Sequence, residues 1–225
     1  MKKVLEFLTE LKDNNNKAWF DAHKSQYLEA KSEFEAAVQQ FIDGMVKVDP
    51  SVAGLTVKDC VYRIYRDVRF SNDKTPYKTH MGAFLCPHGR NSNYAGYYMH
   101  IEAHGSDYIG GHILAAGSYM PTPKQLESIR TEILDNSEEF MATISDAKGF
   151  VMENNSKLQR VPKGFPADFK YADMLKYKDY SIYKTLSDRD ILAPDFIGRV
   201  VADLSLTVPF ITTLNKAIDY ANKEM

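Results

Sequence analysis

The sequence predicts an α+β fold in which an antiparallel four-stranded meander, at about 59–115, packs against N-terminal and C-terminal helices. Apolar residues recur at helical spacing near both ends, whereas the middle of the chain alternates and is rich in Tyr, Val, Ile and Phe. Short turn clusters separate the alternating segments, and such short connections force neighbouring strands to be antiparallel. Strands grouped between helical ends are typical of α+β proteins.

The N-terminal part of the chain predicts two helices. Residues 3–12 place apolar side chains at helical spacing, and the Asp and Asn run at 13–16 then ends that helix. A long helix is expected from about Lys17, capped by Asn16 and ended near Gly44 and Asp49-Pro50.

The strands and the later helices follow from the same patterns. The strands are expected at 59–70, 80–86, 94–103 and 108–115, with turns at 71–73, 87–90 and 104–107. Thr122 and Gln125 form a capping box that begins the next helix. The remaining expected elements are a helical turn around 137–146, an irregular stretch over 149–186 with a short strand at 178–185, a capping-box start at Ser187-x-x-Asp190, and a helix over about 194–222 interrupted near Pro209.

Composition excludes several classes of protein. The chain has 225 residues, of which 44% are hydrophobic and 26% charged, as expected for one soluble domain over 1–225. No apolar run approaches the ~18 residues that span a membrane. Glu6 interrupts the apolar stretch that a signal peptide needs, so we expect a cytoplasmic protein. Cys60 and Cys86 are too few for a disulfide framework and are expected to be reduced thiols.

One segment concentrates basic residues. The net charge of the chain is −2, yet the run 61–80 holds five basic residues and two aspartates. Arginine clusters suit the bidentate capture of carboxylate or phosphate, so we predict an anion-binding site. Its candidate residues are Arg63, Arg66, Arg69, Lys74 and Lys78. If 59–70 is a strand, Arg66 shares its apolar face and is expected to be mainly structural.

Two other interpretations of the basic segment stay open. Asp59, Asp67 and Asp73 offer partners for an ion-pair network that would only support a protein-interaction domain. Basic residues interleaved with tyrosines also resemble, in composition, a nucleic-acid-binding surface. The low net charge argues against nucleic acid as the main partner, and no membrane partner is expected.

Histidine and carboxylate spacing gives the catalytic candidates. His100, Glu102 and His104 alternate along a predicted strand and would share one face, a spacing that can serve a metal. Same-face neighbours lie ~7 Å apart, longer than one metal's coordination sphere permits, so a solvated polar face is expected with no metal and no cofactor. Asp67, His100 and Glu102 are the candidate proton carriers if the protein is an enzyme.

Several long motifs resemble an uncharacterised family of conserved hypothetical proteins, domain of unknown function 2461. The motifs that carry the resemblance are the runs 14–24, 62–71, 73–78, 96–102 and 162–165. Asn72 departs from the pattern, where lysine is expected more often, and this makes the loop less positive. The resemblance implies a single-domain soluble protein and supplies no activity. The function that the sequence favours is therefore binding of a small phosphorylated or carboxylated ligand, with or without catalysis.

Overall fold

The computed structural model describes residues 1–106, 108–152 and 157–223. Its helices are α1 (Lys2–Asp13), α2 (Lys17–Ala22), α3 (Lys24–Met45), α4 (Val57–Cys60), α5 (Pro123–Asp135), α6 (Ser137–Asp146), α7 (Asp188–Ile191), α8 (Phe196–Ser205) and α9 (Val208–Lys223), with 3-10 turns η1 (Pro50–Val52) and η2 (Met174–Lys176). Its strands are β1 (His80–Leu85), β2 (Gly96–Glu102), β3 (His112–Ser118), β4 (Val151–Met152) and β5 (Tyr180–Leu186).

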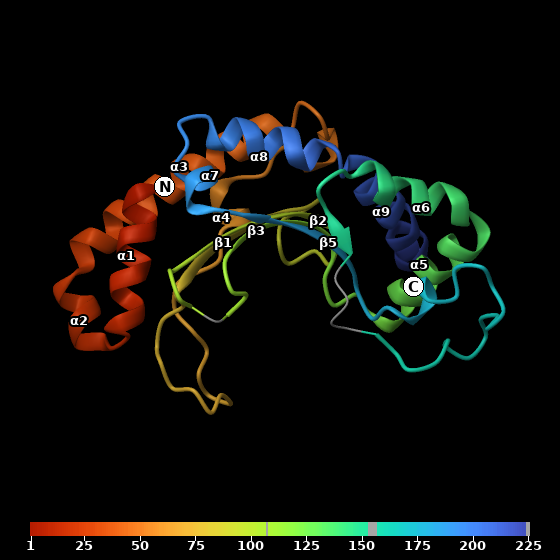
Figure 1. The fold of residues 1–225 in the computed structure, drawn as a ribbon, viewed down its shortest axis with the longest axis horizontal. Coiled ribbons are helices and arrows are strands. Elements are labelled where there is room, and N and C mark those ends of the chain that lie inside the picture. Colours follow the sequence, from red (N-terminus) through yellow and green to blue (C-terminus); the bar gives the residue numbers. More distant parts are fainter. Residues whose placement is uncertain (107, 153–156, 224–225) are drawn as a thin grey trace.

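The strands form one antiparallel sheet in the order β1-β2-β3-β5-β4. Figure 1 shows this sheet nearly edge-on as an arch, with α3 and α8 above it. The helices α1 and α2 lie at one end of the arch, and α5, α6 and α9 lie at the other. Helices from both ends of the chain therefore cover the same face of the sheet, as the α+β prediction requires.

The two faces of the sheet differ in burial. Met81, Ala83, Tyr97, Met99 and Leu114 point to the helices and are at most 6% exposed. They join a hydrophobic cluster that extends from Val4 in α1 to Ile218 in α9. The opposite face holds the paired positions His80↔Glu102, Gly82↔His100 and Phe84↔Tyr98, and it mixes buried with half-exposed side chains. This second face is where the polar residues of the sheet gather.

The predicted helix starts are confirmed, with one difference. Asn16 caps α2 by accepting the Trp19 amide, and capping boxes begin α5 and α7 at Thr122 and Ser187. The expected long helix from Lys17 is interrupted, because α2 ends at Ala22 and α3 begins at Lys24. The His23 ring stacks on Trp19 at 4.1 Å between centroids, which holds the two helices together at this break.

The prediction of a strand at 59–70 was wrong. A capping box between Thr56 and Asp59 draws residues 57–60 into α4. Residues 61–78 then form a long hairpin that has isolated bridges at Val61↔Ala83 and Tyr65↔Tyr77 and no regular strand. The sheet reaches five strands, instead of four, because the predicted strand at 178–185 pairs with β3 as β5, and β4 adds a short edge.

The strand expected at 108–115 starts later, at His112 in β3. Residues 108–111 instead form a loop, with Gly110 and Gly111 at positive φ. The predicted turn residue Asp107, and residues 153–156 of the predicted irregular stretch, lie outside the described residues.

Within the described residues, no single helix combines the length and the apolar character needed to cross a membrane. The helices α8 and α9 meet those criteria only when taken together, and they are bent by 57° relative to each other.

Alanine at Gly117 should destabilise the protein, whereas alanine at Gly198 should not. A Cβ at Gly117 would stand 2.1 Å from the Tyr180 carbonyl oxygen in β5, and the φ of +150° is unfavourable for other residues. Overlap of this kind costs about 1–3 kcal/mol. Gly198 lies in α8 with nothing within 4 Å of such a Cβ, so alanine there should add up to about 1 kcal/mol. Urea unfolding compares the two variants, and equal stabilities would contradict the close approach of β3 and β5.

Candidate functional site

A buried carboxylate lies at the centre of the polar face of the sheet. The Glu102 side chain, at the end of β2, is 1% exposed. It accepts backbone N–H bonds from Tyr108 at 2.9 Å, Ile109 at 3.1 Å and Gly111 at 3.3 Å. Burial alone would favour the neutral acid, but hydrogen bonds from His100, Ser106 and Ile109 hold the pKa of Glu102 at about 2. Glu102 is therefore ionised at neutral pH.

A line of hydrogen bonds leads from this carboxylate toward the half-exposed side of the sheet. His100 is fully buried, and its Nε2 lies 3.1 Å from Glu102 Oε2. Because an ionised carboxylate only accepts, Nε2 carries a proton. Nδ1 lies 2.9 Å from the Tyr98 hydroxyl oxygen and accepts its proton when this nitrogen is unprotonated. Burial raises the pKa of Tyr98, so its phenol keeps its proton. We name these three side chains the Tyr98–His100–Glu102 relay.

Gly82 makes room for the relay on the neighbouring strand. It pairs with His100 in the register of β1 and β2, and a Cβ at this position would stand 2.5 Å from the Tyr98 hydroxyl oxygen. The hydroxyl therefore occupies space that any other residue at position 82 would fill.

A stacked pair of rings covers the relay from the β1 side. The His80 ring lies 4.6 Å from His100 and 4.2 Å from Tyr108, with the second pair nearly parallel. His80 Nδ1 is buried and has no hydrogen-bond partner among the described residues. Burial, together with the neighbouring His100 and Lys78, lowers the pKa of His80 to about 3. His80 therefore stays uncharged beneath the exposed Tyr108 ring.

Two further histidines share one aspartate behind the relay. The Glu102 amide donates to His112 Nδ1 at 3.0 Å, so His112 carries its proton on Nε2 and donates it to Asp188 at 3.1 Å. His104 Nε2 lies 2.6 Å from the other oxygen of Asp188, the first residue of α7. The polar chain thus connects β2 to the C-terminal half of the fold.

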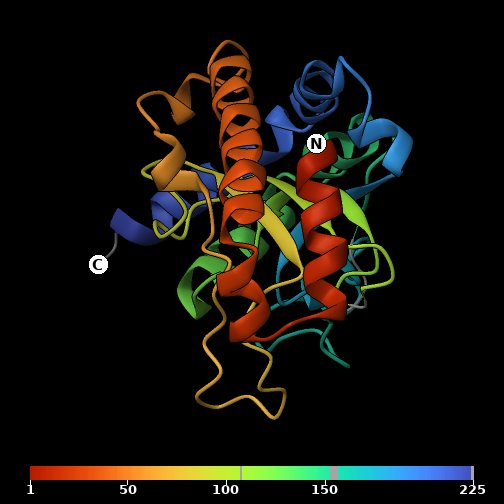
Figure 2. The same ribbon diagram turned by 90° about the vertical axis from the view of Figure 1, so that its left-hand side faces the viewer.

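The basic hairpin, residues 61–78, projects from the body below α2 (Figure 2). Near its tip the cations are paired inside the hairpin. Arg66 binds the side chains of Asp73 and Thr75, and Arg69 makes a two-bond pair with Asp67 at 2.9 and 2.6 Å. Arg66 therefore pairs within the hairpin and not on the apolar face of a strand, and its part in anion binding stays a prediction.

The other cations of the hairpin have no carboxylate partner among the described residues. Lys74 donates to the Val68 carbonyl oxygen at 3.0 Å. Arg63 is exposed, and Lys78 is half-buried with its Nζ 5.4 Å from the Tyr62 ring. Burial and the nearby Arg63 lower the pKa of Lys78. The Tyr62 ring in turn lies 6.3 Å from Tyr98, so Lys78 lies close to the relay, and Arg63 acts electrostatically on Lys78.

The structure brings together only some of the predicted site residues. His100 and Glu102 are in contact, and both are buried, so the expected solvated face was wrong because the two long side chains lean together. Asp67 lies in the exposed pair with Arg69, apart from the relay. Asp59 bonds Thr56 in a helix cap and pairs with no hairpin arginine. The part of all these residues in binding or catalysis stays a prediction.

Sequence reasoning did not identify Tyr108, Asp188 or the role of Gly82. Gly82 could be found only from strand register. The contacts of Tyr108 and Asp188 depend on loop paths that no periodicity describes. No group of three or more His, Cys, Asp or Glu side chains within the described residues is arranged to hold a metal ion.

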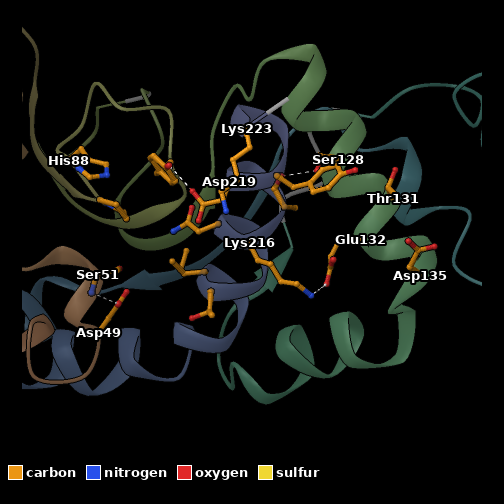
Figure 3. A pocket seen from close by; sticks show the side chains of 17 residues that line it. Asp49, Ser51, His88, Ser128, Thr131, Glu132, Asp135, Lys216, Asp219 and Lys223 are labelled. Carbon is orange, nitrogen blue, oxygen red and sulfur yellow. Dashed lines mark hydrogen bonds and ion pairs between the residues drawn. The ribbon is translucent and has the colours of Figure 1, made fainter. Parts of the chain in front are cut away.

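A cavity of about 990 Å³ lies elsewhere, between α5, α9 and the loops after α3 and β1 (Figure 3). Several of its polar groups already pair with one another: Lys216 binds Glu132 at 3.3 Å, and Tyr94 donates to Asp219 at 2.7 Å. The cavity contains no residue of the relay or of the basic hairpin. We place the candidate site at the relay because its buried, ionised carboxylate holds His100 beside a half-exposed hydroxyl.

Comparison with known proteins gives one match. A family described as "Conserved hypothetical protein (DUF2461)" matches residues 3–212. No curated protein and no solved structure matches the chain.

The buried His80 should make the protein less stable in mild acid. The folded state keeps this ring neutral down to about pH 3, whereas the unfolded chain takes up a proton below about pH 6.5. The contribution of neutral His80 to the free energy of unfolding is therefore fully present above pH 6.5. It falls as the pH drops from about 6.5 to about 3. Between pH 7 and pH 5, the free energy of unfolding measured in urea should fall by about 1–2 kcal/mol less in His80→Phe than in the wild type.

The exposed His88 provides the control for this measurement, since His88→Asn should keep the wild-type pH dependence. Identical pH dependence in His80→Phe and the wild type would mean that His80 titrates normally.

Proposed function

For this chain, which belongs to the conserved hypothetical protein family DUF2461, we propose that the relay and the basic hairpin form a site for a small phosphorylated or carboxylated ligand. The ligand exchanges a proton with the Tyr98 hydroxyl. The observation that carries the proposal is the relay itself: an ionised, buried Glu102 holds His100, which accepts from a partly exposed Tyr98. Burying a charge is costly, and here its partners orient a hydroxyl.

The cations supply the binding half of the site. Lys78 lies near Tyr62 and hence near Tyr98, and it forms no ion pair with a carboxylate among the described residues. The exposed Arg63 acts electrostatically on Lys78 and on Asp67 without forming an ion pair with either. A half-buried ammonium without a partner is unfavourable, and an anion would relieve this cost. Arg69 and Lys74 already bond groups of the hairpin, so they add to the local positive charge and hold the ligand less directly.

The relay supplies the chemical half. When a ligand O–H or C–H gives its proton to the Tyr98 oxygen, the Tyr98 proton moves to His100 Nδ1. His100 becomes an imidazolium whose Nε2–H still faces the Glu102 carboxylate, so the new positive charge is balanced. A concerted transfer avoids a free tyrosinate, whose formation burial opposes. The reverse transfer protonates the ligand, so the site serves as base or acid.

A second candidate rests on the tip of the hairpin. Phe70 is 95% exposed, with the Arg69 guanidinium 5.8 Å from its ring. An exposed aromatic beside cations is typical of single-stranded nucleic-acid binding. Affinity for an oligonucleotide that falls steeply with salt, and is lost in Phe70→Ala, would favour this function over the small ligand.

The two cysteines bear on location. Cys60 and Cys86 are buried free thiols, and burial raises the pKa of Cys60 to about 12, which keeps it unreactive. Free thiols accord with a reducing compartment, so we propose the cytoplasm.

Removing Arg63 and Lys78 together should weaken anion binding. Inorganic phosphate and succinate should raise the melting temperature of the wild type, and the double variant Arg63→Gln/Lys78→Met should bind each at least about tenfold more weakly, because charge-assisted hydrogen bonds are lost. Arg199→Gln, which breaks an exposed pair with Asp195 on α8, is the matched control and should bind normally. Absence of any anion effect on the wild type would refute the site.

Disturbing the relay should reduce proton transfer while binding persists. In turnover of a panel of sugar phosphates, p-nitrophenyl phosphate and 2-oxo acids, Tyr98→Phe should lower kcat about 100-fold or more with little change in KM. Gly82→Ala should have a similar but smaller effect, because its methyl group displaces the Tyr98 hydroxyl. Equal kcat in the wild type and Tyr98→Phe would exclude the relay from the reaction.

A further inference from the structure

We propose that the ligand carries a planar ring as well as its anionic group, and that it is a nucleoside monophosphate whose base stacks on Tyr108. This inference rests on the proposed anion site and names the class of its ligand. Its basis is a surface-exposed aromatic ring that is held in place beside the relay.

Tyr108 presents one face to the protein and leaves much of its ring exposed. Its ring lies 4.2 Å from His80 at an angle of 22°, and 6.1 Å from His100 at 18°. The Tyr108 ring is therefore close to parallel with each histidine ring, and the two histidine rings are tilted by 33° to each other. Tyr108 is nonetheless 67% exposed. A ring placed on its outer side would extend a stack that already exists.

The backbone fixes Tyr108 as well. Its amide donates to Glu102 Oε1 at 2.9 Å, and the next residue, Ile109, donates to the same carboxylate. An exposed aromatic side chain normally loses rotational freedom on binding, which weakens the complex. Here the Glu102 carboxylate, which orients His100, also binds the backbone at Tyr108 and Ile109. Much of the backbone that carries the Tyr108 ring is therefore ordered before the ligand binds.

The ring platform and Lys78 are linked by short contacts: Lys78 lies two residues before His80, which stacks on Tyr108, and its Nζ lies 5.4 Å from the Tyr62 ring. Lys78 and Arg66 both act electrostatically on His80, which lies directly under Tyr108. A ligand with its phosphate at Lys78 and its base on Tyr108 uses both features, whereas a simple anion leaves the aromatic surface bare.

Two other exposed rings, Tyr62 and Phe70, already face cations. The Tyr62 ring has Lys78 at 5.4 Å and Arg90 at 5.8 Å, and Phe70 has Arg69 at 5.8 Å. A base stacking on these rings would compete with a cation. Tyr108 has a histidine ring as its neighbour, so it is the ring we assign to the base.

Binding of three phosphates to the full-length protein tests the inference. Adenosine 5′-monophosphate should bind at least about tenfold more tightly than ribose 5-phosphate or inorganic phosphate, since stacking contributes to the first ligand alone. Tyr108→Leu should remove that advantage and leave ribose 5-phosphate unchanged, while Tyr108→Trp should keep it. Tyr220→Leu, an exposed tyrosine on α9, is the matched control. Calorimetry or melting shifts give the affinities.

Each other result overturns the inference in a distinguishable way. If all three phosphates bind equally and Tyr108→Leu changes nothing, the anion site stands and the ring preference is refuted. If none of them binds, the proposed function fails, and the inference fails with it. If a single-stranded oligonucleotide binds while the mononucleotide does not, the ligand is a nucleic acid and the nucleoside monophosphate is excluded.

Discussion

The buried negative charge of Glu102 determines most of the polar structure around it. A carboxylate without water must have hydrogen-bond donors, and three backbone amides of the 108–111 loop and His100 provide them. This requirement fixes the path of that loop, the orientation of His100 and, through it, the Tyr98 hydroxyl. The Glu102 amide also orients His112. The Glu102 carboxylate thus positions the relay, the 108–111 loop and the exposed Tyr108 ring relative to one another.

The base of the basic hairpin contacts the N-terminal helices, whereas its tip projects from the body of the protein. The Asn15 side chain makes two hydrogen bonds to the backbone of Tyr77, at 2.9 and 3.1 Å, and the Tyr77 ring stacks on Phe20 at 4.0 Å. Lys78 follows Tyr77 directly, so the turn before α2 positions that cation beside the relay. Arg66 and Arg69 lie farther out and pair with the hairpin's own aspartates. The cations near the relay are therefore positioned by the body of the protein.

Local signals in the sequence predicted the parts of the fold that depend on local chemistry. Caps at Thr122 and Ser187 fixed helix starts, because their hydrogen bonds join residues three apart. The alternation of apolar and polar residues over 59–70 predicts a strand, but the structure has none there. Asp67 and Asp73 accept bonds from amides two residues ahead and turn the chain. His100 and Glu102 were identified as candidates, but their burial depends on strand register and on the 108–111 loop, which spacing alone does not describe.

The strand order has a consequence for how the molecule assembles. The strands β1, β2 and β3 pair with their neighbours in sequence, so the relay and its glycine can come together from a short stretch of chain. The strand β5 pairs with β3 across a long stretch of sequence that contains the helices α5 and α6. For example, Leu186 lies opposite His112. Contacts between residues so distant in sequence form slowly, because closing a long loop costs entropy. Asp188 follows β5, so His104 and His112 are expected to gain their shared partner late in folding, after the relay has formed.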